Sequence, residues 1–398
     1  MDPIKEIEFC EVCGNKNLKQ VLNLGNHPLC DDLIKIGSAE VCNEYPIDIL
    51  FCEKCYTAHQ HYQVPKKTLF TESYHYRARM TGSVLSGMSD LVESCEKFFG
   101  NLEGKTVLDI GCNDGSLLDF FKKKKCNTIG VEPTGAGLDS KHFTINEYFD
   151  EISANKVLKK VGSPDLIVFT NVFAHIEDLP RLIDNLNFLA KRDTKIVIEN
   201  HYLGAVFNGG QFDTFYHEHP RTYSYKSFEY IADSLGMSVL DAEFTSRYGG
   251  NIRVYLGAGI AKQLGIDESH FFKSFEKINA DLLQWKTDTK AMIDAHVKAN
   301  GPIRAKAFPG RSAILIKLLN LDVEHISAVY EIEGSIKVQH YVPGTRIPIL
   351  PEKDLYLQDM SLPILNLAWH IPDEVRKNLA RHKYSGEVID IKHGDIPE

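Results

Sequence analysis

The sequence predicts an α/β protein made of three consecutive domains, and three observations support this. Two Cys-x-x-Cys pairs lie in an N-terminal part with little helical periodicity. From Thr106 onward, short apolar runs alternate with helix-like segments, which is typical of a mostly parallel sheet covered by helices. A second, shorter alternating stretch begins after Gly301. We therefore expect domains over residues 1–72, 73–300 and 301–398.

Composition excludes several classes of protein. At 398 residues the chain is long enough for two or three domains, and 43% hydrophobic with 25% charged residues is an ordinary soluble balance. No apolar run is long enough for a membrane span, and the N-terminus lacks the apolar core of an export signal. The net charge of −9 argues against nucleic acid as a partner. We expect a cytoplasmic protein that binds neither nucleic acid nor membrane.

The expected elements follow from the alternation. A helix is predicted over 75–100, and a longer one over 268–300, where neither glycine nor proline occurs. Between these two helices, the segments 106–111, 126–133, 165–173 and 194–202 are predicted strands, and 116–125 and 179–192 are predicted helices. Beyond Gly301, the strands are expected at 302–308, 326–332 and 363–370.

The paired cysteines predict a metal site. Nine cysteines, an odd number, in a chain without an export signal are better interpreted as metal ligands than as disulfides. Four thiolates close the tetrahedral shell of zinc and leave no place for water, which favours a structural role. The predicted ligands are Cys10, Cys13, Cys52 and Cys55, with His27, Cys30, Cys42, His59 and His61 as substitutes. Cys95, Cys112 and Cys126 are expected to be core or loop thiols.

The segment 107–118, VLDIGCNDGSLL, predicts a cofactor site. It joins an apolar strand to a helix through a turn with two glycines, and Glu132 ends the next strand, where an acid can bind ribose hydroxyls. The turn lacks the G-x-G-x-x-G of nicotinamide sites, and Asp114 would repel a pyrophosphate. S-adenosylmethionine has no phosphate and carries a cationic sulfonium, so it is favoured. The predicted cofactor-binding residues are Gly111, Asn113, Asp114, Gly115, Glu132 and Asn171.

Two further segments bear on this site. Tyr148 and Phe149 follow the expected third strand and either flank the adenine or belong to the core. The run Tyr216-His217-Glu218-His219 is dense in titratable groups, and an imidazole suits proton abstraction near neutral pH. A neighbouring tyrosine or second histidine can stabilise an oxyanion. The alternative interpretation of this run is a zinc ligand set or a helix cap.

Taken in order, these motifs resemble a known family. The cysteine pairs, IGCNDGSLL, GVEP, NVFAH, DTFYHEH, YGGNIRV, VPGTRIPI and LAWH are similar to those of zinc-containing sugar C-methyltransferases that make branched deoxysugars. The resemblance implies a small zinc-binding domain, a central Rossmann-like class I S-adenosylmethionine domain and a smaller C-terminal Rossmann-like α/β domain. It implies methylation of carbon-3 of a nucleotide-linked 4-keto-6-deoxysugar.

The resemblance also assigns roles to residues. It implies His219 as the base and Glu218 as its orienting partner, with Tyr216 and His175 near the sugar. A tyrosine from the end of the zinc-binding segment corresponds to Tyr74 or Tyr76. The chain departs from the family pattern at Arg77–Arg79, at Tyr248, at His370 and in the 307–311 loop. Arg77, Arg79 and Arg311 are expected either to meet a diphosphate or to be solvated.

Three other functions remain as alternatives. The first is an oxygen or nitrogen methyltransferase acting on a sugar or small metabolite, since such a nucleophile also needs a base. The second is a zinc-ribbon binding protein whose α/β domain has no catalytic activity, which the intact glycine turn and Glu132 disfavour. The third is a nicotinamide-dependent sugar oxidoreductase, which the chemistry of the turn disfavours.

Overall fold

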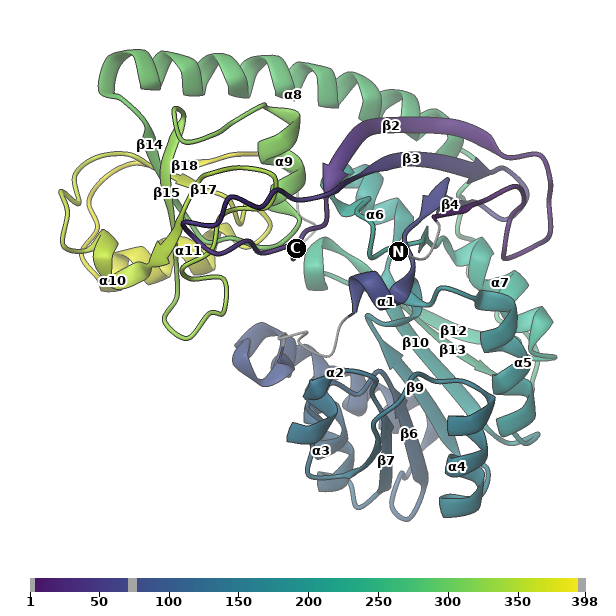
Figure 1. The fold of residues 1–398 in the computed structure, drawn as a ribbon. Helices are drawn as coiled ribbons and strands as arrows, with labels where there is room; N and C mark the ends of the chain where they lie inside the picture. The colour runs from purple at the N-terminus through teal and green to yellow at the C-terminus, as the bar shows by residue number, and fades with distance from the viewer. Residues whose placement is uncertain (1–3, 71–76, 393–398) are drawn as a thin grey trace.

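The computed structural model describes residues 4–70 and 77–392, and three sheets organise them. The seven-stranded sheet, central in the sequence, lies at the lower right of Figure 1, below the four-stranded N-terminal sheet, and the five-stranded C-terminal sheet lies at the upper left. A small two-stranded ribbon pairs β1 (Lys5–Glu6) with β5 (Tyr62–Gln63), and the short helix α1 (Lys66–Leu69) follows it. The α/β class predicted from the sequence is confirmed.

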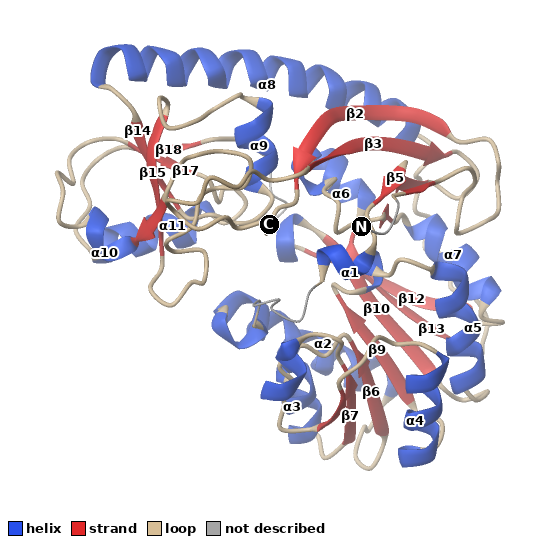
Figure 2. Cartoon of the chain, in the orientation of Figure 1, coloured by secondary structure: helices blue, strands red, loops and turns tan. Residues whose placement is uncertain are grey.

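The central sheet has five parallel strands, in the order β10-β9-β6-β7-β8. Its inner strands β6 and β9 are buried along almost their whole length because helices cover both faces, and they are mostly apolar except for Asp109. Figure 2 shows α2 and α3 on one side of these strands and α4, α5 and α7 on the other. The strands are β6 (Thr106–Ile110), β7 (Asn127–Val131), β8 (Phe143–Ile145), β9 (Leu166–Thr170) and β10 (Lys195–His201). The helices are α2 (Gly82–Phe99), α3 (Ser116–Lys123), α4 (Glu151–Val161), α5 (Leu179–Leu189), α6 (Leu203–Asn208) and α7 (Tyr225–Ser234).

Two antiparallel strands, absent from the sequence-based expectation, complete this sheet. β13 (Asn251–Gly257) pairs antiparallel with β10, and β12 (Ser238–Thr245) pairs antiparallel with β13. Gly250, directly before β13, has a φ of 121° and a backbone so close to Ala205 that a Cβ would lie 2.3 Å from its methyl carbon. The glycine pair of YGGNIRV is therefore a close crossing of the chain over α6.

The N-terminal sheet includes one strand from a distant part of the chain. Its order is β11-β4-β3-β2, and β11 (Arg221–Thr222) comes from the segment directly after Tyr216–His219. The other strands are β2 (Lys19–Pro28), β3 (Glu44–Cys52) and β4 (Thr57–Gln60). Its apolar face, including Leu22 and Ile47, shares one continuous core with helix α8 and the C-terminal sheet. The first 70 residues therefore complete the fold of the rest of the chain.

The C-terminal sheet is entirely parallel, in the order β16-β15-β14-β17-β18. Successive strands run outward from β14 in one direction and then in the other, so the order reverses between β14 and β17. Its strands are β14 (Ile303–Lys306), β15 (Ile326–Glu331), β16 (Ile349–Pro351), β17 (Ile364–Asn366) and β18 (Val388–Asp390). Its helices are α9 (Ser312–Leu318), α10 (Glu352–Leu355) and α11 (Pro372–Arg381).

Two predicted helices begin later than expected. α2 starts at Gly82 rather than 75, because Ala78–Met80 form a separate 3₁₀ turn bound to the glycine turn after β6. α8 (Phe271–Asn300) starts three residues after 268, because the Glu268 carboxylate binds the first backbone N–H groups of α7. α8 then runs as one helix along the N-terminal and C-terminal sheets (Figure 1).

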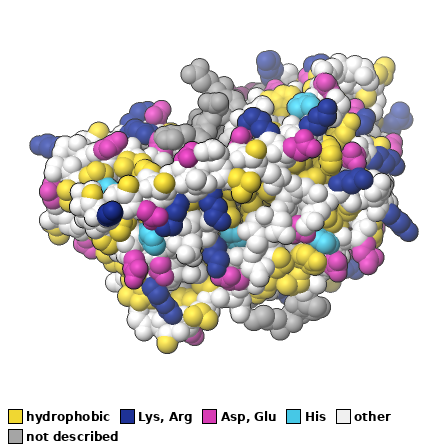
Figure 3. All heavy atoms as spheres, turned by 90° about the horizontal axis from the view of Figure 1, so that it is seen from above, with side chains coloured by type: hydrophobic (Ala, Val, Ile, Leu, Met, Phe, Trp, Pro, Cys, Tyr) yellow, Lys and Arg dark blue, Asp and Glu magenta, His cyan; other side chains and the backbone are white. Residues whose placement is uncertain are grey.

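The surface carries both signs of charge. On the face above α8, basic and acidic side chains alternate with small apolar areas, as Figure 3 shows. Among the described residues, no helix has the length and apolar character needed to cross a membrane.

Candidate functional site

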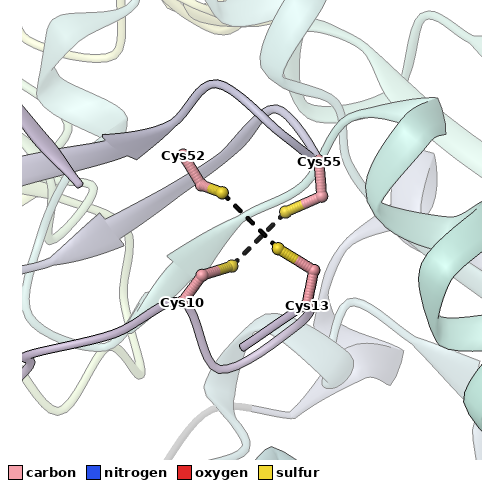
Figure 4. Close-up of side chains that lie close together, drawn as sticks. All are labelled: Cys10, Cys13, Cys52 and Cys55. Carbon is pink, nitrogen blue, oxygen red and sulfur yellow. Dashed lines mark hydrogen bonds between the residues drawn. The ribbon is translucent and has the colours of Figure 1, made fainter. Parts of the chain in front are cut away.

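The four predicted zinc ligands converge. The sulfurs of Cys10 and Cys55 lie 3.3 Å apart and those of Cys13 and Cys52 lie 3.6 Å apart, and all four are within 4.8 Å of one another. Figure 4 shows the thiols of the two loops pointing at a common centre. Sulfurs around a tetrahedral zinc, with Zn–S near 2.3 Å, lie about 3.8 Å apart, so the four thiols fit this ion.

Both cysteine pairs use the same turn. The backbone N–H of Gly14 donates to the Cys10 carbonyl, and that of Tyr56 donates to the Cys52 carbonyl, each at 2.8 Å. Gly14 has a φ of 71° and Tyr56 a φ of 56°. The second position is costly for a tyrosine, and Tyr56 is held there by stacking on the ring of Phe51. The predicted substitute ligands lie outside this thiol cluster.

Hydrogen bonds to the sulfurs complete the metal site. Thr57 Oγ1 lies 3.1 Å from the Cys55 sulfur, Asn15 donates to the Cys52 sulfur, and His59 Nε2 lies 3.3 Å from the Cys10 sulfur. Such partners orient thiolate ligands. Cys95, Cys112 and Cys126 are buried elsewhere as free thiols, as expected for core residues.

One cavity of about 1500 Å³ lies between the domains. It exceeds the usual range for a single small-molecule site, about 300–1000 Å³. Loops following β6, β7, β9 and β10 line one side, and loops following β14, β15 and β17 line the other. The carboxyl ends of the two parallel sheets therefore face the same space. This is the edge at which open α/β sheets bind ligands.

The cofactor side of the cavity is formed by the turn after β6 and the acid after β7. Gly111 has a φ of 75°, and a Cβ there would lie 2.6 Å from the Val172 side chain. The Glu132 carboxylate accepts hydrogen bonds from the Asn113 N–H at 2.9 Å and from the Thr134 N–H and hydroxyl. Three of its roughly four acceptor positions are thus occupied, which leaves one for a ribose hydroxyl.

Asp114 and Gly115 lie differently from the expectation. Neither lines the cavity. The Asp114 carboxylate is buried, accepts hydrogen bonds from the backbone N–H and Nε of Arg79, and accepts one from the Ser116 hydroxyl. These bonds hold its pKa below the usual value despite burial. Because the turn directs this side chain toward the start of α3, Asp114 is a structural anchor.

The remaining predicted cofactor residues line the cavity. Asn171 follows β9 with a φ of 54°, a conformation that asparagine tolerates better than other side chains. Its side-chain oxygen accepts a hydrogen bond from Asn251 at 2.9 Å. Tyr148 also lines the cavity, with its hydroxyl bonded to the Phe70 carbonyl. Phe149 lines it and is partly packed in the core, so both interpretations of this pair hold in part.

His219 stands on the cavity wall beside two other predicted residues. Its ring centroid is 4.3 Å from that of Tyr216 and 4.9 Å from that of His175. Its Nδ1 lies 3.2 Å from the Thr214 carbonyl, which can only accept, so Nδ1 carries the proton and Nε2 is the unprotonated nitrogen. Burial, together with the nearby His175 and His201, holds the pKa of His219 well below its usual value. The ring is therefore a neutral base at pH 7.

The two side chains beside His219 are both uncharged. Burial raises the pKa of Tyr216 well above its usual value, so its hydroxyl keeps the proton. Burial lowers the pKa of His175, and its Nδ1 lies 2.7 Å from the Glu218 carbonyl. Both side chains line the cavity. A neutral base next to the protonated hydroxyl of Tyr216 suits removal of a proton beside a developing oxyanion.

Glu218 does not orient His219 as the resemblance implied. The Thr214 carbonyl does so, because adjacent side chains diverge and the Glu218 side chain faces Asp31 and Lys337. Burial and the Asp31 carboxylate raise the pKa of Glu218 to about 8. Glu218 is therefore largely protonated at neutral pH. The two remaining predicted catalytic residues, Tyr74 and Tyr76, lie outside the described residues.

The N-terminal sheet holds the loop of Tyr216–His219 in place. Gln60 binds the backbone on both sides of it, through the Tyr216 and Pro220 carbonyls. Arg221 is fully buried; it donates to the Glu11 carboxylate, inside the first cysteine pair, and to the Ile176 carbonyl, next to His175. One arginine thus links the metal site to the segments that carry His175 and His219.

The three arginines considered for a diphosphate are ion-paired to aspartates: Arg77 with Asp139, Arg79 with Asp114, and Arg311 with Asp213. Arg311 binds Asp213 through both Nε and Nη2, and the Trp369 indole donates to the same carboxylate at 2.9 Å. Arg311 also lines the cavity. Its charge is thus largely balanced from within the protein.

The sequence analysis missed several cavity residues. Asn200 and His201 end β10 at the same edge as Asn171, and polar residues after a buried apolar strand were the available signal. Asp31 also lines the cavity, yet it lies in a loop with no motif. Asp31 reaches the cavity wall because the N-terminal sheet packs against the C-terminal domain, a contact between distant segments of the chain.

Comparisons with known proteins agree with this organisation. Three family models match in sequence: a zinc binding domain over residues 10–70, a methyltransferase domain over 79–242, and a C-methyltransferase C-terminal domain over 249–389. The C-methyltransferase NovU from Streptomyces niveus is 24% identical over 98% of this chain and 93% of its own length.

Solved structures of methyltransferases are also similar. Magnesium protoporphyrin IX methyltransferase from Synechocystis PCC 6803 with bound SAM matches at 13% identity, covering 49% of this chain and 98% of its own, with a TM-score of 0.36. An S-adenosylmethionine-dependent methyltransferase from Clostridium acetobutylicum matches at 16% identity, covering 44% and 92%, with a TM-score of 0.34. The family models cover nearly the whole chain in one order, and the thiol cluster lies within the first of them. The chain belongs to the S-adenosylmethionine-dependent C-methyltransferases that carry a zinc-binding domain.

Proposed function

We propose that the chain methylates carbon-3 of a nucleotide-linked 4-keto-6-deoxysugar, with His219 as the base. The observation that carries this proposal is the neutral imidazole of His219, with Nδ1 bonded to the Thr214 carbonyl and Nε2 unprotonated, on the wall of a cavity shared by two sheets. Carbon is a poor nucleophile unless a neighbouring carbonyl acidifies its proton. A C-methyltransferase therefore needs a base and an oxyanion donor together.

The cavity residues divide the chemistry between them. His219 Nε2 removes the carbon-3 proton, and the electron pair of that bond moves into the carbonyl to give an enolate. The Tyr216 hydroxyl, kept protonated by burial, is the first candidate to donate a hydrogen bond to the oxygen. Bound S-adenosylmethionine supplies an electrophilic methyl group. Protonated Glu218 avoids placing a second negative charge beside the enolate.

The C-terminal sheet supports a nucleotide-linked substrate. Its strand order reverses between β14 and β17, and crevices at such reversals are where doubly wound sheets bind nucleotides. Loop residues after these two strands, Gly310 and His370, line the same cavity as His219. The cavity volume accommodates more than one ligand. We assign the nucleotide to this edge and the sugar to the space between it and His219.

Deuterium exchange tests the proposal. The protein is incubated in D₂O with S-adenosylhomocysteine and with thymidine- or guanosine-diphosphate-linked 4-keto-6-deoxyhexose. We expect deuterium at carbon-3 with the wild-type protein, and a loss of about 10²–10⁴-fold in His219→Asn, the usual contribution of a general base. His382→Asn, on the exposed C-terminal surface, is the matched control.

Absence of deuterium exchange would contradict the proposal. A protein that binds S-adenosylmethionine but exchanges no proton of either sugar would contradict carbon methylation of these substrates. It would favour an oxygen or nitrogen acceptor on a sugar or small metabolite.

A further inference from the structure

Asn200 carries a buried amide on the cavity wall. It is the last but one residue of β10, is 1% exposed and lines the cavity. Its Oδ1 accepts a hydrogen bond from the Ala174 N–H at 3.2 Å. An N–H can only donate, so this bond fixes which end of the amide faces Ala174. The Nδ2 group has no hydrogen-bond partner among residues 4–70 and 77–392.

A buried donor without a partner is uncommon in a folded protein. Leaving one unsatisfied costs about 1–3 kcal/mol, so each such group in a native structure calls for an explanation, and a catalytic role is one of these. The neighbouring strand repeats the feature, because Thr170 Oγ1, at the end of β9, is likewise buried and unpartnered within the described part of the chain. Thr170 and Asn200 both line the cavity.

The strand order places Asn200 beside the base and away from the cofactor. Glu132 follows β7 and Gly111 follows β6, whereas Asn200 ends β10, two strands beyond β6. Strands are about 4.8 Å apart, so β10 lies roughly 10 Å from β6 along the sheet edge. The Ala174 N–H that holds Asn200 directly precedes His175, whose ring is 4.9 Å from that of His219.

We propose that Asn200 Nδ2 donates a hydrogen bond to the substrate carbonyl oxygen and stabilises the enolate that forms there. The inference rests on the proposed function and adds a catalytic residue to it. The amide gives up no proton: the bond shortens as charge develops on the oxygen. A fixed donor in a water-excluded site needs little reorganisation during the reaction, which is what makes such groups effective.

The test uses a substitution that removes the donor and keeps the acceptor oxygen. Asn200→Asp keeps an oxygen for the Ala174 N–H and replaces Nδ2 with an acceptor, and Asn200→Ala removes both ends. Asn187→Asp, exposed on α5, is the matched control for the added charge. Each variant is measured for carbon-3 deuterium exchange, for kcat and KM in methyl transfer, and for S-adenosylmethionine affinity.

We expect exchange and kcat to fall by about 100- to 1000-fold in Asn200→Asp and by a similar or smaller factor in Asn200→Ala. KM and S-adenosylmethionine affinity should change by less than about threefold. A loss of cofactor affinity equal to the loss of activity would overturn the assignment, because Asn200 would then bind the cofactor. If both variants exchange deuterium as fast as the wild type, the assignment of Asn200 is overturned and the proposed function is not affected. No exchange in the wild type would overturn the proposed function and this inference together.

Discussion

The metal site and the cavity are both built from polar side chains, but they differ in how those side chains are satisfied. At the metal site, four thiols point at one another, and the neighbouring Thr57 and Asn15 bind the sulfurs. On the cavity wall, Asn200 and Thr170 each hold a buried atom with no partner among the described residues. The first pattern is closed and needs only an ion. The second is open and needs a substrate.

The two regions are nevertheless coupled. Glu11, between Cys10 and Cys13, is bound by Lys5, Gln63 and the buried Arg221. Arg221 stands two residues after His219 and also binds the carbonyl next to His175. The metal site therefore helps to fix the geometry of the cavity wall around His175 and His219. Four tests, from the largest expected effect to the smallest, examine how far this division holds.

Loss of zinc should have the largest effect. Cys55→Ser is expected to bind no zinc and to lose the fold of the N-terminal sheet, because structural zinc sites contribute up to about 10 kcal/mol to folding. Metal analysis and thermal unfolding measure this. Cys42→Ser, in the same segment but outside the thiol cluster, should retain one zinc per chain. Zinc retained in Cys55→Ser would remove this cysteine from the ligand set.

Breaking the link between the regions comes second. Glu11→Gln leaves Arg221 charged and buried with a weaker partner, and should cost about 3 kcal/mol of unfolding free energy. The Arg221 and Lys5 charges hold the pKa of Glu11 at about 2. This stabilisation is therefore present above about pH 4.5 and is lost as the pH falls toward 2. Glu8→Gln, exposed nearby, should change stability by less than about 0.5 kcal/mol. Equal denaturation midpoints for the two variants would contradict the link.

Adding a side chain to the turn after β6 should have a smaller effect, confined to binding in the cavity. Gly111→Ala adds a Cβ at a φ of 75° and 2.6 Å from the Val172 side chain. It should weaken S-adenosylmethionine binding by about tenfold or more, since strain of this kind costs about 1–3 kcal/mol. Gly162→Ala has a φ of 71° but no neighbour within 4 Å, so it should affect stability alone. Similar titration curves for both variants would place the cofactor elsewhere.

The pH dependence should show the smallest effect. His219 must be neutral to act, and its pKa is well below 6.5, so kcat/KM should stay within about twofold between pH 7.5 and pH 6. A histidine of ordinary pKa would lose about fourfold over that interval. Above about pH 8, activity should fall as Glu218 ionises beside Asp31 and opposes the enolate charge. In Glu218→Gln this alkaline decline should disappear; an unchanged profile would separate Glu218 from the chemistry.

Much of the fold was predictable because the signals are local. The apolar runs that became β6, β7, β9 and β10 lie between helical segments, and burial on both faces requires such runs. The antiparallel strands β12 and β13 were missed because their pairing with β10 is a long-range contact with no local signature. β11, a two-residue strand, could not be foreseen at all, since it exists only through pairing with β4.

The candidate site divides in the same way. Spacing alone predicted the four thiols, because a tetrahedral ion imposes paired ligands with a turn between them. The glycine turn and Glu132 followed from what a ligand at a sheet edge requires. The roles of Asp114 and Glu218 could not be predicted, because both depend on which partner their carboxylates meet: Arg79 for one, and Asp31 and Lys337 for the other.

The sequence by itself determined the α/β class, the zinc ligands and the segment in which we predict the base, because each rests on residues close together in the chain. Only the tertiary structure decided that both parallel sheets face one cavity, that Thr214 orients His219, and that the Asn200 amide has no partner for its Nδ2 among the described residues. Those features depend on burial and on partners brought together from distant segments. Burial sets the pKa of a base and the energetic cost of an unpaired donor, and no local pattern of residues encodes it.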